Sequence, residues 1–188
     1  MKLNPAQALM SHLALRQETP EVFYAPPGEV CWNAAHLLFV KTQGASVPRM
    51  RARICAHESP TSVQHQMLIA HHESCYVRPH AHVNKDESLL VLEGEAEALL
   101  FSAAGELERV IKLTPSGGTG TFFMQVPPGR IHALWITSPW FVFLETTRGP
   151  FRREDTFFPS WSPPDADAGP FIEQLRFARQ ALLDQELR

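Results

Sequence analysis

Two histidines and a glutamate lie close together in one polar stretch of the chain. His80 and His82 are two positions apart in an extended segment, and Glu87 follows after a short polar turn. Side chains at positions i and i+2 of a strand point to the same face, so the two imidazoles converge on one point. Imidazole nitrogens and carboxylate oxygens are common ligands of transition metals. This spacing therefore predicts a metal chelate presented by a β structure.

A third histidine has a matching context far downstream. Pro127 and Gly129 predict a tight turn that brings His132 to the start of a new strand. Three neutral imidazoles and one carboxylate leave one or two positions open on a six-coordinate metal, and an open position indicates chemistry or ligand capture. The sequence does not choose between iron, manganese, zinc and nickel. We expect one such divalent ion, with the ligands His80, His82, Glu87 and His132.

Two further side chains precede the first histidine in the same alternating pattern. Counting back in twos from His80 reaches Arg78 and Tyr76, so a regular strand would point both into the interior. Arg78 is then a candidate to bind a substrate carboxylate or phosphate, and Tyr76 is a candidate catalytic residue that donates a hydrogen bond to the substrate. The alternatives are an ion pair of Arg78 with Glu145 or Glu73, and a core-filling role for Tyr76.

Two charged residues elsewhere are also candidates for the site. Glu145 ends an otherwise apolar run, residues 141–145, where a buried carboxylate is costly unless it is paired or functional. It is the candidate general base, or a partner to a histidine ligand, and the alternative is a strand-end residue in solvent. Lys85 lies in the turn between His82 and Glu87 and is a candidate for substrate binding. Its alternative is a solvated turn lysine.

One row of side chains could belong either to the interior or to the outer surface. The row shares one face of a predicted strand and contains Arg51, Arg53, Cys55 and His57. If it lines the interior, Arg53 is a further candidate for substrate binding. If Ile54 faces the core instead, the row covers the outer sheet, and the sequence leaves both possibilities open.

The pattern of apolar residues changes after the first fifty positions. Before Met50 it predicts a short helix near the N-terminus, a small strand at residues 21–25 and a helix at residues 30–43. From Met50 onward it follows period two in short runs separated by turns, which is typical of an antiparallel sandwich or barrel. A last helix begins at Pro170, with an apolar stripe that packs on the barrel or on a second subunit. The predicted strands are residues 50–57, 64–72, 75–82, 88–92, 95–101, 107–113, 121–126, 132–137 and 140–147.

The motifs around the predicted ligands resemble those of the cupins. His80, His82, Glu87 and Gly94 match the first cupin motif, with Ser74 where its first glycine is usual, and Pro127, Gly129 and His132 match the second motif, in which Thr121 and Ile136 replace a glycine and an asparagine. The resemblance implies a mainly β, single-domain cupin jelly-roll barrel with N-terminal and C-terminal helices. It divides the chain into an N-terminal helical segment (1–48), the barrel (49–150) and a C-terminal arm and helix (151–188). It also implies a homodimer.

A closer resemblance is to the cupin-fold metalloproteins of the WbuC family, which often accompany genes for surface-polysaccharide synthesis. It extends over roughly residues 20–165 and is carried by residues 48–53, 55–57, 67–70, 76–80 and 145–151. No activity is firmly attached to that family. The resemblance therefore implies a fold, a metal site and a link to polysaccharide synthesis rather than a reaction.

Composition excludes several classes of function. A net charge of −3 with mixed signs gives no reason to expect nucleic acid or a membrane surface as a partner. No apolar run approaches the ~18 residues of a membrane span, and no dinucleotide, P-loop or hydrolase motif occurs. The three cysteines, Cys31, Cys55 and Cys75, are far apart and show no paired spacing, which indicates reduced thiols and a cytoplasmic protein.

The sequence thus supports two hypotheses of different class. The first is a metal-dependent enzyme of isomerase, epimerase or dioxygenase type that acts on a small anionic or sugar-derived molecule, with the metal as Lewis acid. The second is a noncatalytic module that uses the metal to hold a small molecule or carbohydrate. A proton-transferring group near the open metal position, such as Glu145, would favour the enzyme, and Glu145 locked in a salt bridge would favour the module.

Overall fold

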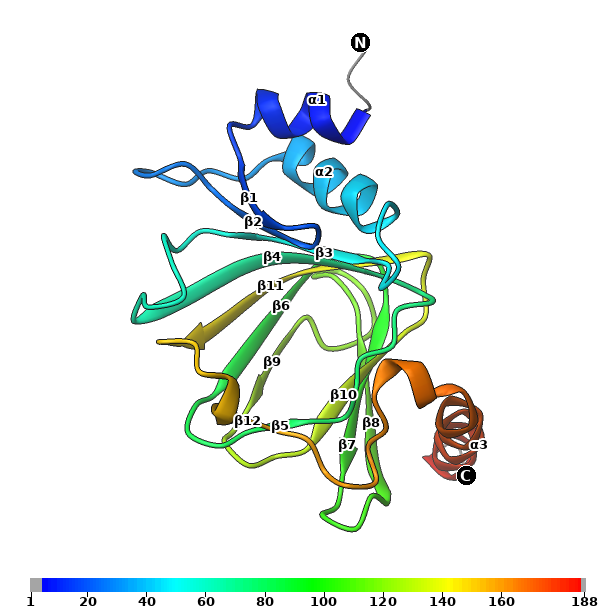
Figure 1. The fold of residues 1–188 in the computed structure, drawn as a ribbon. Helices are drawn as coiled ribbons and strands as arrows, with labels where there is room; N and C mark the ends of the chain where they lie inside the picture. The colour runs from blue at the N-terminus through cyan, green and yellow to red at the C-terminus, as the bar shows by residue number, and fades with distance from the viewer. Residues whose placement is uncertain (1–4, 187–188) are drawn as a thin grey trace.

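A computed structural model describes residues 5–186 of the chain, which form a β barrel with three α-helices (Figure 1). The helices are α1 (Pro5–His12), α2 (Ala34–Gly44) and α3 (Gly169–Glu186), and two 3-10 turns follow the barrel, η1 (Arg153–Asp155) and η2 (Asp165–Asp167). The strands are β1 (Arg16–Thr19), β2 (Val22–Tyr24), β3 (Arg51–Cys55), β4 (Gln64–His72), β5 (Ala81–His82), β6 (Glu87–Glu93), β7 (Ala96–Phe101), β8 (Leu107–Leu113), β9 (Phe123–Val126), β10 (His132–Ile136), β11 (Trp140–Arg148) and β12 (Thr156–Phe157). No helix among the described residues combines the length and the apolar character that crossing a bilayer requires.

The strand order is that of a jelly roll. One sheet runs β1-β2-β3-β4-β11-β6-β9, and the other runs β10-β7-β8. His80, next to β5, pairs with His132 of β10, which extends the second sheet to β5-β10-β7-β8. The four strands β4-β11-β6-β9 therefore face the four strands β5-β10-β7-β8. From β4 to β11 the chain crosses between the two sheets at every connection except the one between β7 and β8, which is the arrangement of a jelly roll. This topology confirms the predicted mainly β cupin-type fold.

Three apolar clusters hold the layers together. Phe141, Phe143 and Met67 belong to the cluster between the two sheets, inside the barrel. On the opposite face of the large sheet, Leu68 and Val142 pack with residues of α1 and α2, which cover that face in Figure 1. Strands β4 and β11 are therefore apolar on both faces, because each lies between the barrel interior and a layer of helix.

The last helix covers the smaller sheet. Leu175 of α3 packs with Leu99 and Ala133, and Arg179 forms an ion pair with Glu97 of β7. The apolar stripe predicted for this helix therefore packs on the barrel of the same chain.

Three predictions about the strands and helices need correction. Residues 75–82 do not form one strand, because only β5, Ala81–His82, has strand structure there. The second helix begins at Ala34 rather than at residue 30, since the Asn33 side chain accepts a hydrogen bond from the backbone N–H of Ala35 and the His36 ring accepts one from the backbone N–H of Asn33. Residues 16–24 form the two strands β1 and β2, where the sequence predicted one.

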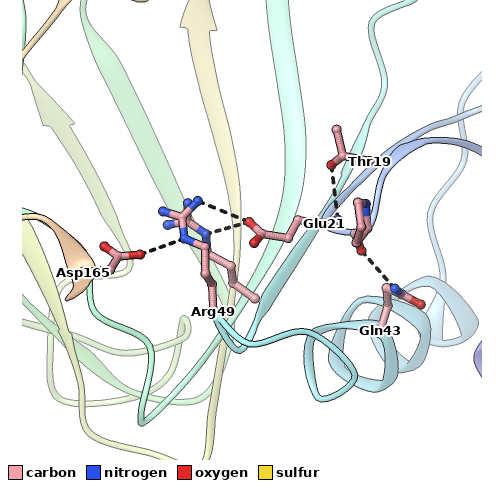
Figure 2. Close-up of polar contacts among 7 residues, drawn as sticks. Thr19, Glu21, Gln43, Arg49 and Asp165 are labelled. Carbon is pink, nitrogen blue, oxygen red and sulfur yellow. Dashed lines mark hydrogen bonds and ion pairs between the residues drawn. The ribbon is translucent and has the colours of Figure 1, made fainter.

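A charged network ties the N-terminal strands to the C-terminal arm, as Figure 2 shows. Arg49 donates to Asp165 (2.9 Å), and both Arg49 and Arg51 approach the carboxylate of Glu21, at 3.5 Å and 3.1 Å. These groups are partly exposed, so each pair contributes little to the free energy of unfolding. The network nevertheless brings three segments that are distant in sequence to one end of β3.

Candidate metal centre

The four predicted ligands come together at one end of the barrel. His80 and His82 lie at β5, Glu87 is the first residue of β6, and His132 is the first residue of β10. One donor atom from each lies within 4.8 Å of the others, and the cluster is at least partly buried. Three imidazole nitrogens and one carboxylate oxygen are a suitable donor set for a divalent transition metal.

The backbone sets which ring nitrogen of two histidines is free to bind a metal. His80 and His132 exchange backbone hydrogen bonds of 3.0 Å and 2.8 Å across the sheet. The Nδ1 atom of His80 lies 2.8 Å from the carbonyl oxygen of Arg78, and Nδ1 of His132 lies 3.0 Å from that of Arg130. A carbonyl oxygen only accepts, so Nδ1 carries the proton in both rings. Their Nε2 atoms are therefore available to a metal.

The carboxylate of Glu87 lies between two of the rings. Its oxygens are 2.8 Å from Nε2 of His82 and 3.3 Å from Nε2 of His132. Burial alone would raise the pKa of Glu87, but the hydrogen bonds from His132 and His82 hold the pKa well below its ordinary value. Burial, together with the neighbouring His132, lowers the pKa of His80 to about 4. Burial acts to lower the pKa of His132, but the hydrogen bond to Glu87 and the charge of Glu87 raise it, so Nε2 of His132 carries a proton that a metal would displace. A carboxylate and a neutral imidazole are the forms that ligate metals.

Tyr76 and Arg78 do not face the barrel interior, which corrects the alternation argument. The hydroxyl of Tyr76 donates to the carbonyl of Pro163 (3.1 Å), and the guanidinium of Arg78 donates to the carbonyl of Ser162 (2.6 Å) and packs on Phe158. The segment before β5 is not a strand, so counting in twos fails there. The alternative ion pair of Arg78 with Glu145 or Glu73 is not formed either. Burial raises the pKa of Tyr76 to about 12.

Arg78 instead positions a ligand, because its carbonyl orients His80 while its side chain fastens the C-terminal arm. Because alanine keeps that carbonyl, Arg78→Ala acts only by releasing the arm, whose Phe158 ring lies beside His80. We expect it to weaken metal binding about 10-fold, the low end of the range for groups that orient metal ligands. The affinity is measured by competition with a chromogenic chelator. Arg49→Ala is the matched control, since it removes another arginine that contacts the arm, through Asp165, away from the ligands. Equal affinity in Arg78→Ala and the wild type would contradict the positioning role.

The row on β3 that the sequence left undecided faces the interior. Cys55 belongs to the cluster inside the barrel, whereas Ile54 packs beneath the helices. Arg53 has the same parity as Cys55 and is therefore on the interior face. His57 lies beyond the strand and stacks on His65, with ring centroids 3.9 Å apart.

Glu145 lies next to the metal ligands on the interior face. It pairs with Leu89 of β6, and Glu87 is two residues from Leu89, so Glu145 and Glu87 are diagonal neighbours at about 7 Å. Burial, reinforced by the charge of Glu87, raises the pKa of Glu145 to about 8. No ion pair or hydrogen bond joins its carboxyl to another described residue. Glu145 is partly buried on the interior side of β11 rather than in solvent, and its catalytic role stays a prediction.

Lys85 is not a solvated turn residue. It lies in the loop between β5 and β6 and is only 7% exposed. Its ammonium is 5.9 Å from the ring centroid of Phe151.

Sequence reasoning missed the contribution of the C-terminal arm to the site. β12 pairs with β5, so Thr156 lies opposite the ligand His82, and Phe158 lies 6.0 Å from the ring of His80. A strand of two residues leaves no periodic signal in a sequence. The aromatic residues of the arm were therefore visible, but their position beside the ligands was not.

Comparisons with known proteins match only parts of the chain. A family model described as a domain of unknown function, DUF6016, matches residues 32–113, and no curated protein matches. A solved protein from Shewanella oneidensis shares 13% identity over 83% of this chain and 85% of its own, with a TM-score of 0.48. A cupin superfamily protein from Desulfitobacterium hafniense shares 20% over 52% and 76% (TM-score 0.42). The DMSP lyase DddQ from Ruegeria pomeroyi shares 22% over 58% and 53% (TM-score 0.45).

Because these similarities are weak or cover only part of the chain, the jelly-roll fold is established here by the strand order of this chain. The resemblance to the WbuC family stays a prediction.

Proposed function

We propose that the protein is a metal-dependent enzyme of the isomerase or epimerase type that acts on a small anionic or sugar-derived molecule. The observation that carries this proposal is the position of Glu145 beside Glu87, inside the barrel and free of any ion pair with a described residue. A carboxyl locked in a salt bridge would have favoured the noncatalytic module. A carboxyl with a pKa near neutrality is suited to proton transfer.

The roles follow from the geometry of the chain. His80, His82, Glu87 and His132 would hold the ion, which when bound supplies a Lewis acid that polarises a carbonyl or hydroxyl oxygen. Glu145 would give or take a proton at a carbon or oxygen next to that group. In the metal-free chain its pKa is raised to about 8, which is close enough to neutrality for the carboxyl to give or to take a proton. Dioxygenation fits an iron site. The position of Glu145 supports proton transfer and offers no comparable support for a reaction with oxygen.

Solvent exchange tests this function even when the product has not been identified. The purified protein is analysed for bound metal and incubated in D₂O with pooled sugars, sugar phosphates and hydroxy acids. Proton transfer next to a carbonyl replaces a C–H signal in the proton spectrum by deuterium. Oxygen uptake with the iron-loaded protein tests the dioxygenase. If metal binds but neither exchange nor oxygen uptake occurs with any pool, the noncatalytic module is the better interpretation.

Replacement of the proposed acid–base group gives a sharper result. We expect Glu145→Gln to reduce exchange by at least about 100-fold while metal content stays at the wild-type level. Glu95→Gln is the control, because Glu95 is an exposed carboxylate paired with Lys112 and lies outside the barrel interior. Loss of metal together with exchange would show that Glu145 supports the ligands instead.

The remaining parts of the proposal rest on the sequence. The resemblance alone supports a substrate linked to surface-polysaccharide synthesis and a homodimer, and the unpaired spacing of the three cysteines supports a cytoplasmic location. Light scattering at several protein concentrations tests the dimer, and a monomer at all of them would remove it.

A further inference from the structure

Two cationic side chains on the interior side of the barrel, the buried Lys85 and the half-buried Arg53, lack a counter-ion among the described residues. Lys85 is 7% exposed, and no described residue forms an ion pair or a hydrogen bond with its ammonium group. The Nε atom of Arg53 is buried and also lacks a hydrogen-bond partner, and Arg53 forms no ion pair with any described residue. Buried charges and unpaired donors are costly, so they call for an explanation other than packing.

The two cations act on the same part of the interior. Arg53 is on the interior face of β3, two residues before Cys55. Cys55 pairs across the sheet with Met67 of β4, and Met67 pairs with Glu145 of β11. Lys85 comes from the loop between β5 and β6, two residues before the candidate ligand Glu87. Burial dominates the pKa of Glu145 and raises it, but the charges of Arg53 and Lys85 both lower it, so both lie within electrostatic range of that carboxyl.

Glu145 does not serve as their counter-ion. Its carboxylate forms neither an ion pair nor a hydrogen bond with Arg53, Lys85 or any other described residue, and the two cations reach it only through longer-range electrostatic interaction. Glu87 is occupied by His82 and His132. Among the described residues, the barrel therefore holds two cations and no anion matched to them.

We propose that Arg53 and Lys85 form an oxyanion subsite, and that the molecule bound beside the metal ligands is a small acid carrying a carboxylate or a phosphate group. The planar guanidinium suits two oxygens of such a group, and the ammonium adds a point charge. This inference rests on the proposed function because it places the subsite in the same interior as the metal. It narrows the substrate to charged molecules and excludes neutral sugars.

Matched pairs of ligands test the subsite by calorimetry with the Mn²⁺-loaded protein. Lactate is compared with propane-1,2-diol, and glycerol 3-phosphate with glycerol, so that each pair differs by the charged group. We expect at least one charged member to bind about 10-fold or more tightly than its neutral partner. Arg53→Gln and Lys85→Met should each reduce that preference about 10- to 100-fold, while Arg53→Lys retains part of it. Lys112→Gln, which removes an exposed lysine, should leave it unchanged.

Thermal unfolding of the same variants separates a subsite from a scaffold role. Removing an unpaired buried cation should leave the midpoint unchanged or raise it, whereas removing a structural ion pair would lower it. Equal binding of charged and neutral partners, a preference that survives both substitutions, or a lowered midpoint in both variants would each overturn the subsite.

Metal analysis keeps this result distinct from the proposed function. Metal binding without any preference for charged ligands refutes the subsite alone. A preference that depends on Arg53 and Lys85 in protein that binds no metal supports the subsite and refutes the metal enzyme.

Discussion

Replacing His80 and His82 together with alanine is expected to reduce metal affinity by at least about 1,000-fold. The substitutions remove two of the four ligands, and a four-ligand zinc site contributes about 10–16 kcal/mol, so two ligands account for several kcal/mol. Each 1.4 kcal/mol corresponds to a tenfold change in affinity. The measurement is metal content after dialysis, followed by competition with a chelator for the retained ion.

The control removes two histidines that lie outside the cluster. His12 is exposed on α1, and His72 ends β4 with its ring against Ser74 and Trp140. A protein that carries alanine at both positions should keep the wild-type affinity. Wild-type affinity in the His80 and His82 double variant would remove the site assignment, because no other group of described residues offers a comparable donor set.

The turn between β6 and β7 should tolerate no side chain at Gly94. Its φ of +77° is in the left-handed region, and an added Cβ would lie 1.9 Å from the carbonyl oxygen of Trp140 and 2.6 Å from Oγ of Ser138. We expect Gly94→Ala to lower the free energy of unfolding by about 2–4 kcal/mol, since backbone strain and a clash with backbone add together. Urea denaturation at fixed metal content measures the change.

A second glycine isolates the contribution of the clash. Gly117 also has a positive φ, +96°, but a Cβ there would meet no atom within 4 Å. Gly117→Ala should therefore cost only about 1 kcal/mol, the strain of the backbone conformation. Equal losses in the two variants would show that the contact with Trp140 relaxes at little cost.

Local spacing was sufficient to predict the ligands and much of the barrel. Two features depend only on neighbours in the sequence and not on the rest of the fold. They are the i, i+2 relation of His80 and His82 and the turn before His132. Strands β4 and β11 were also predictable, because period-two runs separated by turns indicate strands, whereas their burial on both faces became visible only in the fold.

The environment of the other charged residues was not predictable, because it depends on which segments meet in space. Arg78 and Tyr76 contact an arm more than eighty positions away, and the face of β3 that carries Arg53 is interior only because helices cover the opposite face. Lys85 has the sequence context of a turn residue and is buried only by the fold.

The sequence by itself determined the four candidate metal ligands and an antiparallel sandwich or barrel, since both follow from periodicity and short-range geometry, and the cupin resemblance added the jelly-roll topology. Tertiary structure alone decided which charges share the interior with Glu145, because burial and electrostatic range are properties of segments that fold together from distant parts of the chain.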